Sequence, residues 1–156
     1  MRNIILLTSE FPPLPGGIGT HALQLAMGLS QNGYRVTVIT DRRSNDWEKE
    51  DIFDTNLSFK VIRIARKSYG RTYWNRILQT IIQIIKVKQQ IVIGSGKFSL
   101  WTIGFVSLFF RNNKYLGVIH GTELRAGGSI SKLLTKLSLK KCRKLIAVSN
   151  FTKSGI

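Results

Sequence analysis

Short apolar runs alternate along the chain with longer stretches in which apolar residues recur at helical spacing. The short runs, rich in β-branched residues, predict strands at 3–8, 34–40, 57–65, 91–94, 114–120 and 144–149. The stretches between them predict helices at 20–33, 71–90, 98–110 and 129–142, and a last helix from Asn150. The acidic segment at 41–56 breaks this alternation and is expected to be a loop.

Strands that alternate with helices favour a parallel sheet with right-handed crossovers. The first strand is apolar without interruption, which is typical of a strand covered on both faces. The sequence therefore predicts one Rossmann-like, doubly wound α/β domain over residues 1–156. The longest apolar run, Phe98 to Phe110, is too short to span a bilayer, so a helix buried in the core is favoured over a membrane-inserted segment.

The charge of the chain is strongly positive and unevenly distributed. The net charge is +16, and no acidic residue occurs between Asp54 and Glu123 or after Glu123. Such a surface suits a polyanion, an anionic membrane or phosphorylated ligands. A single cysteine, Cys142, excludes an internal disulfide, and no metal-ligand spacing is present. A reduced, cytoplasmic setting is the simplest interpretation.

The segment after the first strand offers two interpretations. Gly17, Gly19 and Ala22 fit the G-x-G-x-x-G/A fingerprint of dinucleotide-binding proteins, and Asp41 stands where the ribose-binding acid is expected. In that fingerprint the first glycine turns directly after the strand. Here eight residues containing all three prolines of the chain intervene between Thr8 and Gly17. Prolines hold such a connection extended, so the tight turn is lost and a dehydrogenase domain is disfavoured.

What remains is an arm that ends in Gly16, Gly17, Ile18 and Gly19, followed by a helix. Glycines allow backbone N–H groups to approach a ligand closely, and a helix N-terminus favours an anion. The alternative is a plain turn between strand and helix.

Three motifs resemble a known family. The stretch EFPPLPGGIGTHALQLAMGLSQNGYRVTVIT is similar to the opening of GT-B fold glycosyltransferases of family four. GVIHGTEL resembles the His-Gly-x-Glu loop of that family, and CRKLIAVSNFTKSGI resembles the strand and helix that close its N-terminal domain. Tyr34 departs from the pattern, which usually has histidine there. Residues 41–112 match only as an alternation of elements.

The resemblance implies roles for individual residues. Gly16 to Gly19 would lie against the diphosphate of a nucleotide-sugar donor. His120 would lie beside the transferred sugar, and Glu123 would orient His120 or bind a sugar hydroxyl. For His21 a site role and a structural role are equally open. The alternatives without a catalytic role are a structural histidine at position 120 and, at position 123, a carboxylate that caps the approach to the helix expected from Ser129.

The resemblance also implies an architecture and partners. The chain would be the N-terminal, acceptor-side half of a retaining glycosyltransferase. The C-terminal, donor-binding half is absent from this chain, which would be inactive alone. A nucleotide sugar would be a co-substrate, with no further cofactor and no metal, and the acceptor would be a glycan or a lipid-linked molecule.

Two cationic clusters point to the inner face of the membrane. One lies on the helix expected at 129–142 and just beyond it, where leucines alternate with Lys132, Lys136, Lys140, Lys141, Arg143 and Lys144. The other interleaves aromatic and basic residues between Arg66 and Arg76. Cationic faces beside apolar side chains suit an anionic bilayer. The alternative is an ordinary solvated helix face, which explains the leucines but not the lack of acidic residues, since solvated faces usually mix charges of both signs. A basic module that binds nucleic acid or membranes without catalysis is the alternative function, but no nucleic-acid-binding signature is present.

Overall fold

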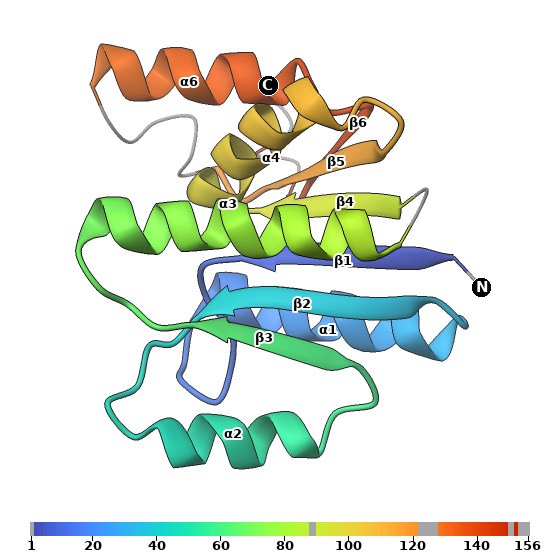
Figure 1. Ribbon diagram of the computed structural model, residues 1–156, viewed down its shortest axis with the longest axis vertical. Helices are drawn as coiled ribbons and strands as arrows, with labels where there is room; N and C mark the ends of the chain where they lie inside the picture. The colour runs from blue at the N-terminus through green and yellow to red at the C-terminus, as the bar shows by residue number, and fades with distance from the viewer. Residues whose placement is uncertain (1, 88–89, 122–127, 150–151, 153–156) are drawn as a thin grey trace.

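The apolar runs form one parallel β-sheet in the computed structural model of the chain, which describes residues 2–87, 90–121, 128–149 and 152 (Figure 1). The strands within these ranges are β1 (Asn3–Thr8), β2 (Arg35–Asp41), β3 (Lys60–Ile64), β4 (Gln90–Ser95), β5 (Lys114–Ile119) and β6 (Lys144–Ala147). Their order is β3-β2-β1-β4-β5-β6, and each neighbouring pair is parallel. The predicted doubly wound parallel sheet is confirmed.

The described helices cover both faces of this sheet. They are α1 (Gly17–Gln31), α2 (Trp47–Thr55), α3 (Tyr69–Lys86), α4 (Lys97–Phe109) and α6 (Ser129–Leu139). In Figure 1, α1 lies behind the sheet and α3 in front of it. The chain moves in one direction from β1 to β3 and in the other from β4 to β6, so right-handed crossovers place α1 and α4 on opposite faces.

β1 shows why the central strands are apolar throughout. Ile4 and Leu6 belong to the core beneath α1, whereas Ile5 and Leu7 belong to the core beneath α3 and α4. All four side chains are buried. Because successive residues of a strand point to opposite faces, a strand covered on both sides cannot alternate with polar residues.

The acidic segment is not the loop that the sequence suggested, since residues 47–55 form α2. Asp46 caps this helix, because its carboxylate accepts a hydrogen bond from the backbone N–H of Lys49 at 3.2 Å. That bond lowers the pKa of Asp46, since it favours the ionised form. Glu48 and Glu50 lie in the first turn, where negative charge is favoured by the helix dipole. The acidic composition of this segment suggested a loop, although Asp46 is the N-cap of a helix.

The expectation of a wholly buried helix at 98–110 is only half right. α4 buries Leu100, Ile103 and Val106 against the sheet. Leu108 and Phe109, however, are 54% and 67% exposed. Of the remaining predicted elements, those in the described residues have the expected type with shifted ends. The helix expected from Asn150 falls almost wholly outside the described residues. No described helix is long and apolar enough to cross a membrane.

Ion pairs and hydrogen bonds from neighbouring arginines fix the proline-containing loop between β1 and α1. Arg43 donates a hydrogen bond to the carbonyl oxygen of Pro15 at 3.2 Å, and Arg63 donates one to that of Pro12. Both arginines also contact the buried carboxylate of Glu50 on α2. The backbone N–H of Arg43 donates to it at 2.9 Å, and the guanidinium of Arg63 lies 3.2 Å from it. The acidic helix therefore holds the loop in place.

The start of α1 packs directly on the backbone of this loop. A Cβ atom added at Gly19 would lie 3.1 Å from the backbone nitrogen of Phe11, a residue that is fully buried. At Gly16 an added Cβ would lie 2.4 Å from a carboxylate oxygen of Glu10. At Gly17 it would meet nothing within 4 Å. Close packing on backbone atoms thus accounts for Gly19 but not for Gly17, and at Gly16 the obstructing atoms belong to the side chains of Glu10 and Arg43, which can move.

A buried ion pair joins β2 to α3. Both carboxylate oxygens of Asp41 accept hydrogen bonds from Nη2 of Arg76, at 2.7 and 2.8 Å. The two residues are only 4% and 3% exposed. Each charge therefore depends on the other for compensation.

Replacing Asp41 with alanine should lower the free energy of unfolding by about 3–5 kcal/mol, because the charge of Arg76 would be left buried without its main partner. Urea denaturation followed by circular dichroism measures this loss. The double variant Asp41→Ala, Arg76→Met should be more stable than Asp41→Ala alone. A single-variant loss under about 1 kcal/mol, the size typical of an exposed pair, would contradict this account of the pair.

Replacing Gly19 with alanine should destabilise the domain by about 1–3 kcal/mol, as overpacking usually does, because the loop backbone must move away from the new methyl group. Gly17→Ala is the matched control from the same helical turn, and its stability should be unchanged or slightly higher. Thermal unfolding of the two variants compares them. Equal melting temperatures would show that the loop does not pack on α1 as described.

Candidate functional site

The candidate site lies at the carboxyl edge of the sheet, where β1, β4 and β5 end. β1 and β4 are neighbours, and the chain leaves them toward opposite faces. Such a switch point leaves a crevice between the connections that follow the two strands, and ligands of open α/β sheets bind there. The segments that converge on it begin after Thr8, Ser95 and Ile119.

The glycine motif forms the first turn of α1 at this edge. The helix begins at Gly17, and Gly16 is its N-cap. Gly16 has no side chain to cap the helix, so the first backbone N–H groups are left for a ligand or solvent. The sequence predicted a glycine arm in front of the helix. The structure instead places Gly17, Ile18 and Gly19 within the helix itself.

The two histidines of the chain meet beside this helix start. Their rings, from His21 of α1 and His120 directly after β5, are 5.3 Å apart between centroids and nearly perpendicular, at 88°. Nε2 of His120 lies 2.9 Å from the hydroxyl oxygen of Ser95. Nδ1 of His21 is buried and has no hydrogen-bond partner among the described residues. Segments distant in sequence thus bring three polar side chains together.

Two glycines with positive φ follow the strands that end at the site. Gly96, after β4, has φ of 86°, and Gly121, after His120, has φ of 98°. Residues other than glycine rarely adopt these backbone angles. A Cβ atom at Gly96 would come within 3.9 Å of Ile18, so the turn after β4 lies beside the glycine motif.

The predicted site residues are therefore mostly brought together. Gly16 to Gly19, His21 and His120 share the carboxyl edge, while Glu123 lies outside the described residues. Ser95 was missed by sequence reasoning. Its signal was a polar residue at the end of an apolar strand, next to a glycine. Among the described residues, no cluster of three or more His, Cys, Asp or Glu side chains could hold a metal ion.

A polar cavity of about 350 Å³ opens next to the proline loop, on the α3 side of the sheet. Its wall combines Ser9 and Glu10 of the loop, the cations Arg66 and Lys67 after β3, and Tyr73 of α3. Burial raises the pKa of the Tyr73 hydroxyl, so this group remains protonated at neutral pH. The cavity was not predicted, because it is formed by loops from separate parts of the chain.

Asp41 also borders this cavity, but its carboxylate is held by Arg76. It is therefore not free to bind the ribose hydroxyls of a dinucleotide. The connection from Thr8 to the helix start at Gly17 is as long as the sequence indicated. Both observations support the rejection of a dehydrogenase domain.

The fold is shared with several solved structures. A UDP-GlcNAc 2-epimerase from Methanocaldococcus jannaschii superposes with a TM-score of 0.67 at 15% identity, covering 99% of this chain and 41% of its own. HepE from Anabaena, solved in complex with UDP, gives 0.69 at 12% identity, covering 99% and 40%. MurG from Acinetobacter baumannii gives 0.61 at 14% identity, covering 97% and 42%.

The chain thus spans about two-fifths of the length of these proteins. At such low identity the likeness shows the fold, that of the N-terminal half of GT-B enzymes. No curated protein matches the chain significantly in sequence. The family profile of Glycosyltransferase Family 4, in contrast, matches residues 15–156, nearly the whole chain, and the chain therefore belongs to that family.

Proposed function

We propose that the chain is the acceptor-side half of a retaining glycosyltransferase. The complete enzyme uses a nucleotide sugar and transfers the sugar to a glycan or lipid-linked acceptor at the cytoplasmic face of the membrane. One observation carries this proposal: the glycine helix start, His21, Ser95 and His120 converge at the switch point of the sheet. Family membership is consistent with it.

The start of α1 is suited to the diphosphate of the donor. A helix N-terminus presents backbone N–H groups and a partial positive charge to an anion. The close packing of Gly19 on Phe11 fixes the direction of these groups before any ligand binds. Donors fixed in advance are the most effective means of stabilising charge that develops on a leaving group. Gly16, Gly17, Ile18 and Gly19 would therefore hold the departing diphosphate.

His120 is suited to contact the sugar. It lies directly after β5 at the carboxyl edge, and its contact with Ser95 orients the ring. His21 packs edge-on against that ring and would hold it from the side of α1. We assign the sugar contact to His120 and a supporting position to His21. Glu123 would orient His120 or bind a sugar hydroxyl.

The donor would be bound chiefly by a second, C-terminal half. The solved relatives of this fold are more than twice as long as the chain, and one of them was solved with UDP. We infer that a cleft between two halves forms the complete site. On this proposal the 156-residue chain transfers no sugar by itself, and it needs the nucleotide sugar as co-substrate but no further cofactor.

The surface of α6 supports a site at the membrane. Its leucines Leu133 and Leu137 are 57% and 49% exposed, although they stand on a helix with the exposed lysines Lys132 and Lys136. Apolar and cationic side chains exposed together bind anionic bilayers by both insertion and attraction. On a helix face that contacts only water, exposed leucines would not be favoured. The same surface is what a membrane-binding module without catalysis would show, so activity must decide between them.

Replacing His120 with alanine in the complete enzyme should lower kcat a hundredfold or more, because the contact acts mainly in the transition state. Steady-state kinetics of sugar transfer measure this loss, and circular dichroism checks the fold. If Glu123 only orients His120, Glu123→Ala should lose less, and the double variant should be no worse than His120→Ala. Unchanged kcat with a lowered Tm would make His120 structural and remove its catalytic role.

The chain should bind vesicles that contain anionic lipids and bind neutral vesicles weakly. Each lysine near an anionic surface contributes about 1 kcal/mol, so Lys132→Gln with Lys136→Gln should weaken binding roughly thirtyfold. Co-sedimentation measures binding, which should also fall at high salt. Arg35→Gln with Lys60→Gln removes two exposed charges from the amino edge of β2 and β3 and serves as the control. Equal binding to both vesicle types would contradict electrostatic docking.

A further inference from the structure

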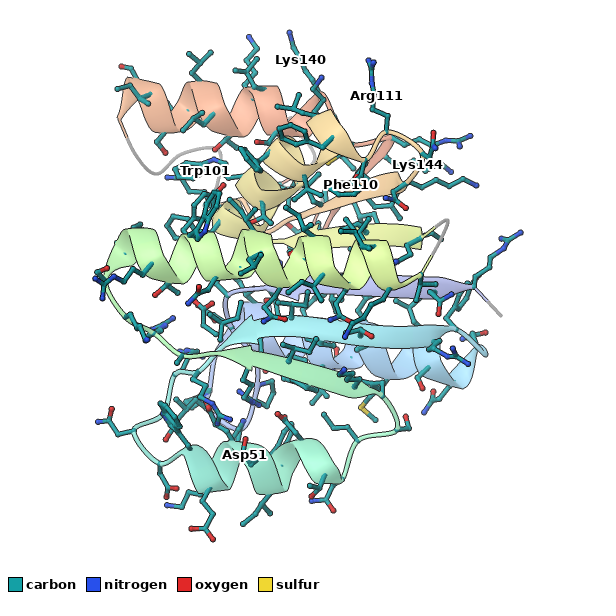
Figure 2. All side chains as sticks on the ribbon, in the orientation of Figure 1. Asp51, Trp101, Phe110, Arg111, Lys140 and Lys144 are labelled. Carbon is teal, nitrogen blue, oxygen red and sulfur yellow. The ribbon has the colours of Figure 1, made fainter. Side chains whose placement is uncertain are left out.

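An apolar groove of about 760 Å³ runs between α3, α4 and α6. Its volume falls in the range of about 300–1,000 Å³ that is usual for ligand sites. Figure 2 shows Trp101, which lines it, between α3 and α6. The groove is mainly apolar, although Lys140 and Lys141 are among its lining residues. It shares Tyr69, Tyr73 and Phe98 with the polar cavity beside the proline loop, so one wall of aromatic rings lies between the two.

We propose that these two cavities together bind a lipid acceptor, with its hydrocarbon chain in the groove and its phosphate head in the polar cavity. The inference rests on the proposed function, which leaves open whether the acceptor is a glycan or a lipid, and it selects the lipid. It places the head of the acceptor beside the proline loop, which also leads to the glycine motif.

The groove is built for an apolar ligand. Phe98 stands edge-on to Tyr69 and to Trp101, each at 5.4 Å between ring centroids. The indole N–H of Trp101 is already satisfied, since it donates to the hydroxyl of Thr135 on α6 at 3.0 Å. The indole ring therefore offers apolar surface without a polar group that needs a partner. Phe105, Leu134 and Leu137 continue the lining.

The depth of the groove is fixed by close packing of α4 on α6. A Cβ atom at Gly104 would lie 2.3 Å from the hydroxyl oxygen of Ser138, so the two helices touch at this point. Along α4 the lining extends from Phe98 to Leu108, about 15 Å at the rise of an α-helix. The groove thus suits an elongated chain that lies along α4 with one end near the carboxyl edge of the sheet.

The polar cavity has cationic charge left for an anion. Asp41 is compensated by Arg76 at 2.7 Å, and Glu10 lies 4.0 Å from Arg43. Arg66 reaches Asp41 only at 3.6 Å and is half exposed, and Lys67 beside it is exposed. With both carboxylates already facing other cations, these two side chains are suited to a phosphate group.

The distribution of charge favours this occupant over others. A neutral apolar ligand would leave the cations after β3 unused, and a sugar phosphate without a chain would leave the groove empty. Exposed leucines of α6 border the same groove, so a chain could pass into it from the surface on which α6 is proposed to dock. A lipid with a phosphate head would fill the apolar groove with its chain and place its phosphate in the adjoining cationic cavity.

The test uses farnesyl phosphate below its aggregation limit, with farnesol and inorganic phosphate as the two partial ligands, in calorimetric titrations of the 156-residue chain. Farnesyl phosphate should bind at least tenfold more tightly than either partial ligand. Arg66→Gln with Lys67→Gln should abolish this preference over farnesol, whereas Lys60→Gln, at the opposite edge of the sheet, should not change it. Equal affinity for farnesol and farnesyl phosphate would overturn the assignment of the head.

A second variant tests the groove. Gly70 lines it, and a Cβ atom there meets nothing within 4 Å, so Gly70→Leu should fill the groove without disturbing the fold. Binding of farnesyl phosphate should weaken at least tenfold. Gly28→Leu on α1 is the control, since its Cβ is equally unobstructed and Gly28 does not line the groove. Unchanged binding by Gly70→Leu would overturn the proposal.

Two further outcomes are distinguishable. If sedimentation shows a dimer that Gly70→Leu dissociates, the groove is covered by a second copy and the lipid assignment is wrong. The titration requires neither donor nor transfer. Failure to bind while the complete enzyme glycosylates a soluble glycan would therefore overturn only this inference. Binding without any transfer would overturn only the proposed function.

Discussion

The contact between Gly19 and the backbone of Phe11 is the constraint on which the candidate site depends. It seats the first turn of α1 against the loop that leaves β1. With α1 placed in this way, His21 reaches the ring of His120, which comes from the other side of the switch point. A larger residue at position 19 would push the loop backbone and the first turn of α1 apart, and so disturb the N–H groups and the histidine pair.

The acidic residues help to hold the same loop in place. Most of them are gathered on α2 and its cap, and Glu50 is fully buried there. Arg43 and Arg63 bond to that carboxylate on one side and to the proline loop on the other. Because Glu50, Asp51 and Asp54 are engaged with Arg42 and Arg63, these three acids do not offset the lysines elsewhere on the surface. The ion pairs of α2 thus hold the loop in place and occupy three of the few acidic side chains.

The sheet could be predicted from the sequence because each strand carries its own local pattern. Residues 4–7 are all apolar since both faces of the strand are buried, and this signal needs no knowledge of distant residues. α2 was predicted wrongly because overall acidity outweighed a local start signal, the cap at Asp46. For residues 98–110, high hydropathy indicated burial, yet one face of α4 lines a groove.

The candidate site was predictable only in part. The glycine motif and His120 could be found from motifs, since each lies within a short segment of the chain. The proximity of His21 to His120 could not, because it depends on how two crossovers pack across the sheet. Ser95 and the polar cavity were missed for the same reason. The role of each of these groups in transfer is a proposal that rests on their arrangement.

The central claim is that the start of α1 holds the diphosphate of a nucleotide sugar. A crystal structure of the complete enzyme with an intact, slowly reacting donor tests it most directly. The account predicts diphosphate oxygens about 2.7–3.2 Å from backbone nitrogens among Gly17, Ile18 and Gly19, with His120 against the sugar. A donor whose diphosphate lies in the polar cavity near Arg66, or anywhere away from α1, would contradict it.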